Sequence, residues 1–167
     1  MMAIRENISP ERRRQANEEA VKQLEKILPP GIILSYAPFR SELDISPLNN
    51  LLAASDRLTL PKVKNESLQI FLISDITKQL KPSSWGILEP ITEYCTKIDV
   101  DKISAVLVPG IAFDANNYRL GYGKGYYDHL LPKMKHAVSI GIGFLEQKID
   151  RFPLDVWDHP LDQLMFF

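Results

Sequence analysis

Residues 103–110 read ISAVLVPG, and this stretch decides the class of fold. Ile103 to Val108 are apolar apart from Ser104, and Pro109-Gly110 ends the run. A short apolar run that is bounded by turn residues is typical of a strand buried on both faces of a parallel sheet. Similar runs predict further strands over residues 32–36, 57–60, 68–73 and 137–142.

Segments with helical spacing of apolar residues separate these strands. The first 30 residues predict one amphipathic helix, with Ser9 as its N-cap, Pro10 in its first turn and Pro29-Pro30-Gly31 as its end. Shorter helices are expected over residues 47–54 and 126–131. Alternating strands and helices predict a three-layer α/β/α fold, Rossmann-like, with a mainly parallel central sheet.

Length and composition limit the class of protein. The chain has 167 residues and a mass of 19.0 kDa, which suits one domain spanning residues 1–167. It is 45% hydrophobic and 25% charged, which excludes a disordered or fibrous protein. The net charge of −1 gives no basic field for nucleic acid or an anionic membrane. Since neither a signal peptide nor a membrane span is evident, we expect a cytoplasmic monomer that binds neither nucleic acid nor membrane.

Cysteine and histidine give no sign of a metal centre. The single cysteine, Cys95, excludes an internal disulfide and a cysteine-rich metal site. His129, His136 and His159 lack the spacing of metal ligands, so surface or structural roles are expected for them.

Glycine and tyrosine concentrate after the ISAVLVPG strand. Six of the eight glycines lie between residues 110 and 143, and four of the six tyrosines lie between residues 118 and 127. The segment 119–128 reads RLGYGKGYYD. It follows the carboxyl end of the strongest predicted strand, where open α/β sheets bind ligands.

This segment has the chemistry of a polyphosphate site. Glycines at 121, 123 and 125 allow backbone amides to approach a phosphate closely, and a helix that begins near Gly125 would add the positive end of its dipole. Arg119 and Lys124 supply full positive charges. The spacing matches neither the dinucleotide fingerprint nor the Walker A loop. A mobile surface loop therefore remains the alternative on residues alone.

From Pro109 to Asp128 the sequence resembles the signature of the 5-formyltetrahydrofolate cyclo-ligase family, also called 5,10-methenyltetrahydrofolate synthetases. The matching elements are Pro-Gly, a small-Phe-Asp triplet, Arg-Leu-Gly, Gly-x-Gly and Gly-Tyr-Tyr-Asp. Weaker similarities in the same order are Leu34-Ser35-Tyr36, Glu42, Leu60-Pro61-Lys62, Trp85-Gly86-Ile87, Glu89-Pro90 and the acidic pair Asp158 and Asp162.

The resemblance implies an isomerase/CoA-transferase-like scaffold and an ATP-dependent ligase of folate one-carbon metabolism. The implied reaction closes the ring of 5-formyltetrahydrofolate, with or without a polyglutamate tail, to give 5,10-methenyltetrahydrofolate, ADP and phosphate. ATP and Mg²⁺ are the implied cofactors. A non-catalytic nucleotide- or folate-binding module of the same fold is the alternative, followed by a sugar-phosphate isomerase and a protein–protein adaptor.

The resemblance also assigns residues to roles. Lys124 and Arg119 are expected to be catalytic, and Asp128 and Asp162 to hold Mg²⁺. The expected ATP-binding residues are Arg5, Arg119, Leu120, Gly121, Tyr122, Gly123, Lys124, Gly125, Tyr126 and Tyr127. The expected folate-binding residues are Leu34, Glu42, Trp85, Tyr122, Gly123, Lys124, Gly125 and Tyr126.

Several of these residues have structural alternatives. Trp85 would more often be a core aromatic residue, Tyr127 is expected to face the core, and Asp128 would otherwise be an early-helix carboxylate. Asp114 is expected to cap a turn. Asn117 stands where the family has glycine, but asparagine tolerates a positive φ. Tyr122 stands where some members have arginine, and only Ile4-Arg5 matches the N-terminal Lys-x-x-Leu-Arg of the family.

Overall fold

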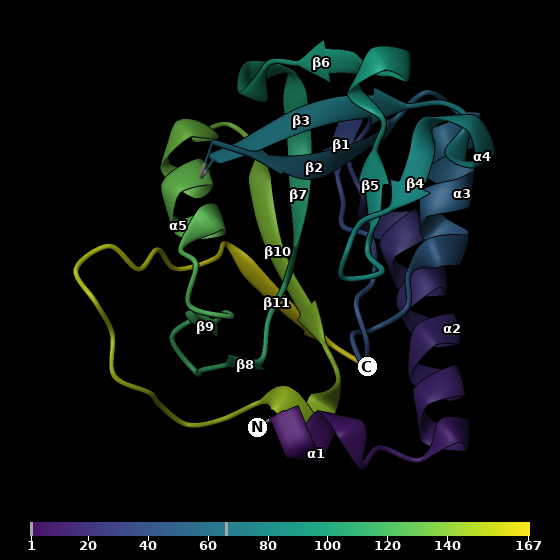
Figure 1. Ribbon diagram of the computed structural model, residues 1–167. Helices are drawn as coiled ribbons and strands as arrows, with labels where there is room; N and C mark the ends of the chain where they lie inside the picture. Colours follow the sequence, from purple (N-terminus) through teal and green to yellow (C-terminus); the bar gives the residue numbers. More distant parts are fainter. Residues whose placement is uncertain (1, 66) are drawn as a thin grey trace.

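The computed structural model describes residues 2–65 and 67–167, and its centre is a seven-stranded sheet (Figure 1). The strand order is β11-β10-β7-β1-β2-β3-β6. The five strands from β11 to β2 are parallel, and β3 and β6 are antiparallel to their neighbours. Their bounds are β1 (Ile32–Leu34), β2 (Leu58–Lys64), β3 (Ser67–Ile73), β6 (Thr96–Ile98), β7 (Ile103–Pro109), β10 (Val138–Gly143) and β11 (Gln163–Phe166).

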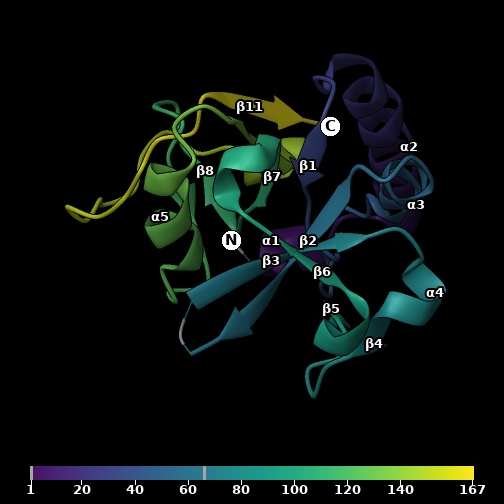
Figure 2. The ribbon, with the colours of Figure 1, turned by 90° about the horizontal axis from the view of Figure 1, so that it is seen from above.

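Helices cover both faces of this sheet (Figure 2). α2 and α3 lie on one face, whereas α5 and the 3₁₀ turn η3 lie on the other. The predicted three-layer α/β/α arrangement with a mainly parallel sheet is confirmed. The helices are α1 (Met2–Glu6), α2 (Pro10–Ile27), α3 (Ser46–Ala54), α4 (Ile76–Gln79) and α5 (Tyr126–Leu130), with 3₁₀ turns η1 (Thr92–Tyr94), η2 (Val100–Lys102), η3 (Leu131–Lys133) and η4 (Leu145–Gln147).

Two short hairpins stand outside the main sheet. β4 (Leu80–Pro82) pairs with β5 (Leu88–Pro90), and β8 (Ala112–Phe113) pairs with β9 (Arg119–Leu120). Neither hairpin was expected, because strands of two or three residues carry too little apolar periodicity to be recognised. The final strand β11 was also missed.

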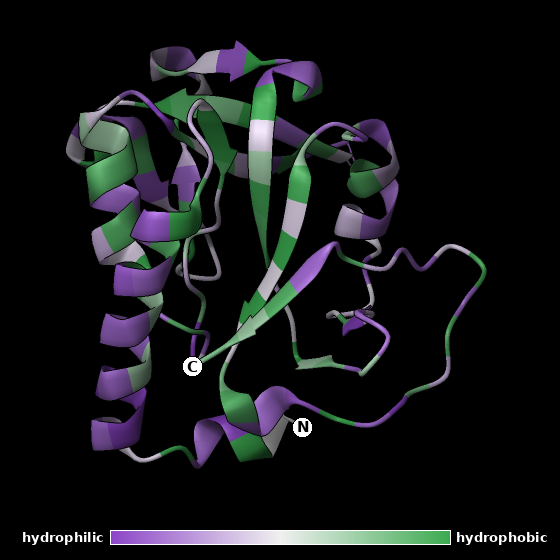
Figure 3. Cartoon of the chain, turned by 180° about the vertical axis from the view of Figure 1, so that it is seen from behind, coloured by the Kyte–Doolittle hydropathy of each residue, from purple (hydrophilic) through white to green (hydrophobic). Residues whose placement is uncertain are grey.

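The side chains of strand β7 show that both faces of the sheet are buried. Ala105 and Leu107 belong to the core beneath α2 and α3, whereas Val106 and Val108 belong to the core beneath α5. All four side chains are fully buried. Figure 3 shows mainly hydrophobic residues along the strands of the sheet and many hydrophilic residues along α2.

The N-terminal region forms two helices where one was predicted. Ser9 caps α2 by accepting a hydrogen bond from the Arg12 amide (3.2 Å), and Pro10 opens that helix, as expected. The cap requires an extended backbone at Ser9 (φ −59°, ψ 149°), which separates α2 from α1. Figure 1 shows α1 beyond the carboxyl ends of β7 and β10.

Strand β2 continues through Pro61, where the sequence predicted its end. β1 pairs with β2 only as far as Leu34 and Thr59, so Pro61 faces no strand on that side and its missing N–H costs no ladder bond. The free side of β2 beyond Thr59 is available to border a cleft. In the described ranges no helix is long and apolar enough to cross a membrane.

Candidate active site

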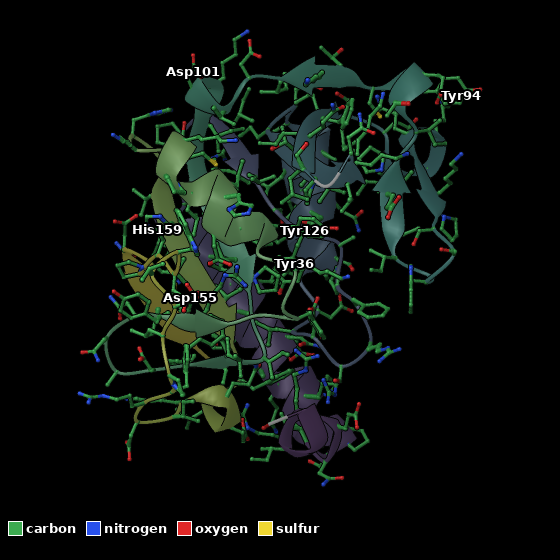
Figure 4. All side chains as sticks on the ribbon, turned by 60° about the vertical axis from the view of Figure 1, so that its left-hand side comes forward. Tyr36, Tyr94, Asp101, Tyr126, Asp155 and His159 are labelled. Atoms are coloured by element: carbon green, nitrogen blue, oxygen red, sulfur yellow. The ribbon has the colours of Figure 1, made fainter. Side chains whose placement is uncertain are left out.

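A cleft of about 620 Å³ opens at the carboxyl ends of β1 and β7. This is the edge at which α/β sheets bind ligands. Tyr36 and Tyr126, labelled close together in Figure 4, both line it. The remaining lining residues are Ala37, Phe39, Glu42, Leu60, Pro61, Val63, Trp85, Ile87, Leu88, Glu89, Pro109, Arg119, Gly121, Tyr122, Gly123, Lys124, Gly125 and Tyr127.

Residues 121–125, the glycine loop, form one wall of the cleft. Within residues 2–65 and 67–167, none of the five amides in this loop donates a hydrogen bond to another protein atom. Gly123 and Gly125 adopt positive φ values of 79° and 65°, and a Cβ at Gly123 would meet no atom within 4 Å. The backbone is therefore open on the side where a ligand would approach, and the exposed Lys124 adds a charge beside it.

The helix after the glycine loop contributes a weaker dipole to the cleft than the sequence predicted. α5 spans only Tyr126–Leu130, so it carries little of the macrodipole that the sequence prediction assigned to it. Gly125 is its left-handed N-cap. The positive charge at this wall comes instead from side chains and free amides.

Arg119 lies in the wall of the cleft and is paired with Asp128. Its Nη2 donates to Asp128 Oδ2 at 3.0 Å, and the two side chains are 6% and 17% exposed. The guanidinium carbon lies 5.0 Å from the centre of the Tyr127 ring, and the buried Nε has no hydrogen-bond partner. Burial raises the pKa of Tyr127 further than the charge of Arg119 lowers it. The Tyr127 side chain packs against the core beneath α5 and against the Arg119 guanidinium.

Glu42 lines another part of the cleft, on the turn 39–42, whose Phe39 ring meets the Tyr122 ring of the glycine loop edge to face with centres 6.5 Å apart. Its carboxylate accepts a hydrogen bond from the Phe39 amide (3.0 Å) and is largely buried. Burial raises the pKa of Glu42, and the Phe39 amide, the charge of Arg5 and the Tyr122 hydroxyl oppose that effect. A buried carboxylate held in this way can accept hydrogen bonds from a ligand in the cleft.

Trp85 projects from the β4–β5 hairpin into the rim of the cleft. The turn is closed by a hydrogen bond from the Ser83 amide to the Ile87 carbonyl (2.8 Å), and Gly86 adopts φ 80°. Trp85 is 73% exposed, which rules out the alternative of a core aromatic residue. An exposed indole at a cleft rim offers a flat face to a ring system.

Three predicted ligand residues lie away from the cleft wall. The side chain of Leu34 is fully buried in the sheet core, and β1 ends there, two residues before Tyr36, the first cleft residue along the chain. Leu120 pairs with Ala112 in the β8–β9 hairpin. Arg5 is 1% exposed and lies behind Tyr122, so it does not reach the cleft in this structure.

The structure does not bring together the two carboxylates that were expected to share Mg²⁺. Asp162 Oδ2 accepts hydrogen bonds from the amide and hydroxyl of Ser139, both at 2.7 Å, at the amino end of β11. Asp128 and Asp162 line different hollows. The described residues contain no group of three or more His, Cys, Asp or Glu side chains arranged to hold a metal ion. Asp128 lies in α5 and Asp162 directly before β11, and the sequence alone does not show where these two elements lie relative to each other.

The turn before β9 has the predicted local chemistry. Asp114 Oδ1 accepts hydrogen bonds from the Asn116 and Tyr118 amides, both at 2.9 Å, which makes Asp114 a turn cap. Asn117 adopts φ 66°, the conformation for which glycine or asparagine is suited.

A second hollow of about 530 Å³ lies beside α5. Tyr126 lines both this hollow and the cleft, and Asp128 lines the second hollow. Trp157, which is 69% exposed, and His159 form its other side. Figure 4 shows His159 on the segment that leads to β11. Sequence reasoning missed this hollow and did not assign the cleft residues Tyr36, Phe39 and Val63 to the site, although two of these three residues are aromatic.

Comparisons with known proteins agree with this architecture. The family model described as the 5-formyltetrahydrofolate cyclo-ligase family matches residues 1–166. The 5-formyltetrahydrofolate cyclo-ligase of Escherichia coli (strain K12) is 26% identical over 166 residues, covering 94% of this chain and 91% of that protein.

Two solved structures are similar to the whole fold. The Aquifex aeolicus 5,10-methenyltetrahydrofolate synthetase has a TM-score of 0.83 and 33% identity, covering 96% of this chain and 82% of that one. The Mycoplasma pneumoniae 5,10-methenyltetrahydrofolate synthetase has a TM-score of 0.72 and 26% identity, covering 96% and 90%. The family match over nearly every residue and the shared architecture lead to one conclusion: this chain belongs to the 5-formyltetrahydrofolate cyclo-ligase family.

Proposed function

We propose that this chain converts 5-formyltetrahydrofolate and ATP into 5,10-methenyltetrahydrofolate, ADP and phosphate. The observation that carries the proposal is the glycine loop, whose five amides have no acceptor within the described residues and line the same cleft as Glu42 and Trp85. The glycine loop therefore suits a polyphosphate, and the part of the cleft that Glu42 and Trp85 line suits a ring system with N–H donors.

The residues present fit ATP. Free backbone amides at residues 121–125 can donate to phosphate oxygens, and Lys124 supplies a mobile positive charge beside them. Arg119 is held in the wall by Asp128 and keeps an unpartnered Nε–H. These donors would cradle the phosphates and neutralise the charge that develops on the transferred group.

The residues also fit Mg²⁺, but with one carboxylate in place of two. Asp128 uses Oδ2 to pair with Arg119, and Oδ1 makes no hydrogen bond in the described residues. Mg²⁺ commonly takes one carboxylate together with phosphate oxygens and waters. Asp162 is not included, because its carboxylate is occupied by Ser139.

The other wall suits the reduced folate. Trp85 and Tyr126 present flat faces for the pterin and aminobenzoyl rings, and the Glu42 carboxylate would accept hydrogen bonds from pterin N–H groups. The volume of about 620 Å³ lies within the range of small-molecule sites. The second hollow, which Tyr126 also lines, would give room for the rest of the nucleotide.

The reaction needs activation of a poor electrophile. The formyl group of the substrate is an amide, and its oxygen is a poor leaving group. ATP supplies a phosphoryl group for that oxygen, after which the neighbouring N10 can attack the carbon and phosphate can leave. The protein's part is to align the two substrates and stabilise charge, since phosphoryl transfer asks for little covalent work from side chains.

The test combines product formation with binding. The purified chain is incubated with 5-formyltetrahydrofolate and Mg-ATP, the methenyl product is followed by its absorbance, and ADP replaces ATP in a control. Calorimetry measures the binding of each substrate alone. Product that depends on ATP supports the proposal. Binding of both ligands without product would instead identify a non-catalytic module.

A further inference from the structure

One carboxylate of the cleft has no part in the function proposed above. Glu89 lies in the middle of β5, half-buried, and lines the cleft together with Trp85 and Ile87 of the same hairpin. In the part of the chain that the structure describes, it forms no salt bridge. Its negative charge is therefore not neutralised by a direct ion pair and is available to a ligand.

The residues directly after Glu89 fix its strand to the rest of the fold. Lys62 of β2 donates from Nζ to the Pro90 carbonyl (2.7 Å), and the Ile91 amide donates to the Gln79 carbonyl (2.8 Å). β5 thus packs against the part of β2 that borders the cleft. Glu89 is presented by an anchored strand, as a preorganised charge requires.

The other charged groups nearby have different positions or partners. Lys81 lies opposite Glu89 in the hairpin, but it is exposed and is absent from the lining of the cleft. The Lys62 ammonium makes the backbone contact described above. Glu42, the other glutamate of the cleft that carries a site role, already accepts the Phe39 amide (3.0 Å). Glu89 is therefore the carboxylate best able to face a cation in the cleft.

The proposed reaction creates such a cation within the folate. The formyl amide is neutral, but once its oxygen has taken the phosphoryl group of ATP, N5 and the formyl carbon share a positive charge. N10 then bonds to that carbon, the carbon–oxygen bond breaks with its electron pair going to phosphate, and the departing phosphate takes the N10 proton. The methenyl product keeps one positive charge, which N5 and N10 share.

The cations of the glycine loop cannot stabilise this charge. Lys124 and Arg119 line the same cleft and are suited to neutralise phosphate, which leaves a positive charge in the folate without a partner from that side. A fixed carboxylate beside the reacting carbon would stabilise the cationic states more than the neutral substrate. Such a difference between the two states lowers the barrier to reaction.

We propose that Glu89 is a catalytic residue that faces the N5, formyl carbon and N10 atoms of the bound folate and stabilises their positive charge, staying ionised throughout. The proposal rests on the proposed function, because only that reaction produces the cation. It gives the two glutamates different tasks: Glu42 accepts bonds from the pterin, and Glu89 acts on the reacting atoms.

The first experiment compares the binding of a cation and of a neutral molecule that share one skeleton. Calorimetry measures the dissociation constants of 5,10-methenyltetrahydrofolate and 5-formyltetrahydrofolate for the wild type and for Glu89→Gln. We expect the variant to bind the cationic product about tenfold more weakly, and the neutral substrate within about twofold of the wild type. The substitution removes the charge and keeps the size of the side chain, so a purely structural role would not separate the two ligands.

The second experiment measures the rate of methenyl formation. Glu89→Gln should lower kcat by about 100-fold with little change in KM for either substrate, since the lost interaction forms only after phosphoryl transfer. Glu89→Asp keeps the charge, so it should retain the wild-type affinity for the product and lose less than about tenfold in kcat. Thermal unfolding of both variants should match the wild type, because the carboxylate forms no salt bridge among the described residues.

Glu93→Gln is the matched control. Glu93 lies four residues further along the chain in η1, is exposed and is absent from the lining of the cleft. The same change of charge at this position should leave kcat and both dissociation constants unchanged. The control separates a local effect at the cleft from a general effect of net charge.

Other results would overturn the inference. Equal weakening of product and substrate binding in Glu89→Gln would make Glu89 a general folate contact. Undiminished kcat in that variant, beside an active wild type, would exclude Glu89 from the reaction and leave the proposed function intact. A wild-type chain that forms no methenyl product would overturn the proposed function itself.

Discussion

Lys124 and Arg119 carry the same charge at the glycine loop but differ in how the protein holds them. Lys124 is exposed, and it makes no salt bridge among the described residues. Arg119 is buried against Asp128 and the Tyr127 ring. Substitution of the lysine therefore tests chemistry alone, whereas substitution of the arginine also tests the stability of the wall.

Lys124→Ala should lower kcat by about 100-fold, because it removes a cation that stabilises charge on the transferred phosphoryl group. The thermal midpoint should stay within about 1 °C of the wild type, since an exposed side chain contributes little to packing. Rates come from the methenyl absorbance assay, and Lys97→Ala in β6 is the control for loss of a surface charge. Undiminished turnover in Lys124→Ala would contradict its phosphate role.

Arg119→Ala should lose both activity and stability. The substitution leaves the Asp128 carboxylate without its partner, which costs on the order of 3 kcal/mol for a buried pair. Adding Asp128→Leu removes the orphaned charge and should recover much of that stability without any activity. Denaturant unfolding measures the difference. Equal stability of Arg119→Ala and the wild type would mean that the ion pair contributes nothing to the wall.

Glu42 gives the site a pH dependence. Burial raises the pKa of Glu42, so its carboxylate becomes protonated at a higher pH than an exposed glutamate would. If the ionised form accepts bonds from the pterin, kcat/KM for folate must fall as the pH falls through that raised value. Glu42→Gln should remove this acid limb and lower kcat/KM at neutral pH. A wild-type profile that is flat on the acid side would exclude Glu42 as the acceptor.

At the scale of elements, the β4–β5 hairpin places an aromatic residue over the cleft. Trp85 sits at its tip, and the chain has only two tryptophans. Trp157→Phe therefore leaves Trp85 as the sole indole, and 5-formyltetrahydrofolate should change its fluorescence in a saturable way. The reciprocal variant Trp85→Phe keeps Trp157 at the second hollow and should respond less to folate. Identical responses of both variants would place the folate elsewhere.

The free edge of β2 and the β8–β9 hairpin both contribute residues to the cleft. The pairing of β2 with β1 ends at Thr59, so the edge of β2 around Pro61 is free to border the cleft, and the β8–β9 hairpin places Arg119 against Asp128 of α5. The sequence analysis named Pro61 and Arg119, but it predicted neither the continuation of β2 through Pro61 nor the β8–β9 hairpin. A proline normally predicts the end of a strand, because it cannot donate a hydrogen bond to a neighbouring strand. Here β1 stops before it reaches Pro61, so no bond is lost, but the sequence does not show where a neighbouring strand stops.

At the scale of the whole molecule, stability should depend on the shared sheet. Leu107 lies fully buried in β7, the third of seven strands, and contacts the layer of α2 and α3. Leu107→Ala should destabilise the fold by about 3 kcal/mol through lost packing and a residual cavity. Leu51→Ala in α3, which removes an exposed leucine, should change stability by less than about 0.5 kcal/mol. Chemical denaturation of both variants measures the contrast.

Local sequence patterns determined several strands, helix caps and turns of this protein. The apolar run 103–108, the Ser9 cap and the Asp114 turn all depend on near neighbours in the chain, and the structure has each of them as predicted. The physical reason is that burial periodicity, capping and turn conformation are short-range preferences.

Tertiary structure alone decided which distant residues meet. Asp162 was expected beside Asp128 but bonds Ser139, and Arg5 was expected on a nucleotide but lies behind Tyr122. Leu34 was expected at the ligand but lies in the core. Such outcomes depend on strand order and on where a strand stops relative to its neighbours, and no local preference of the chain encodes either quantity.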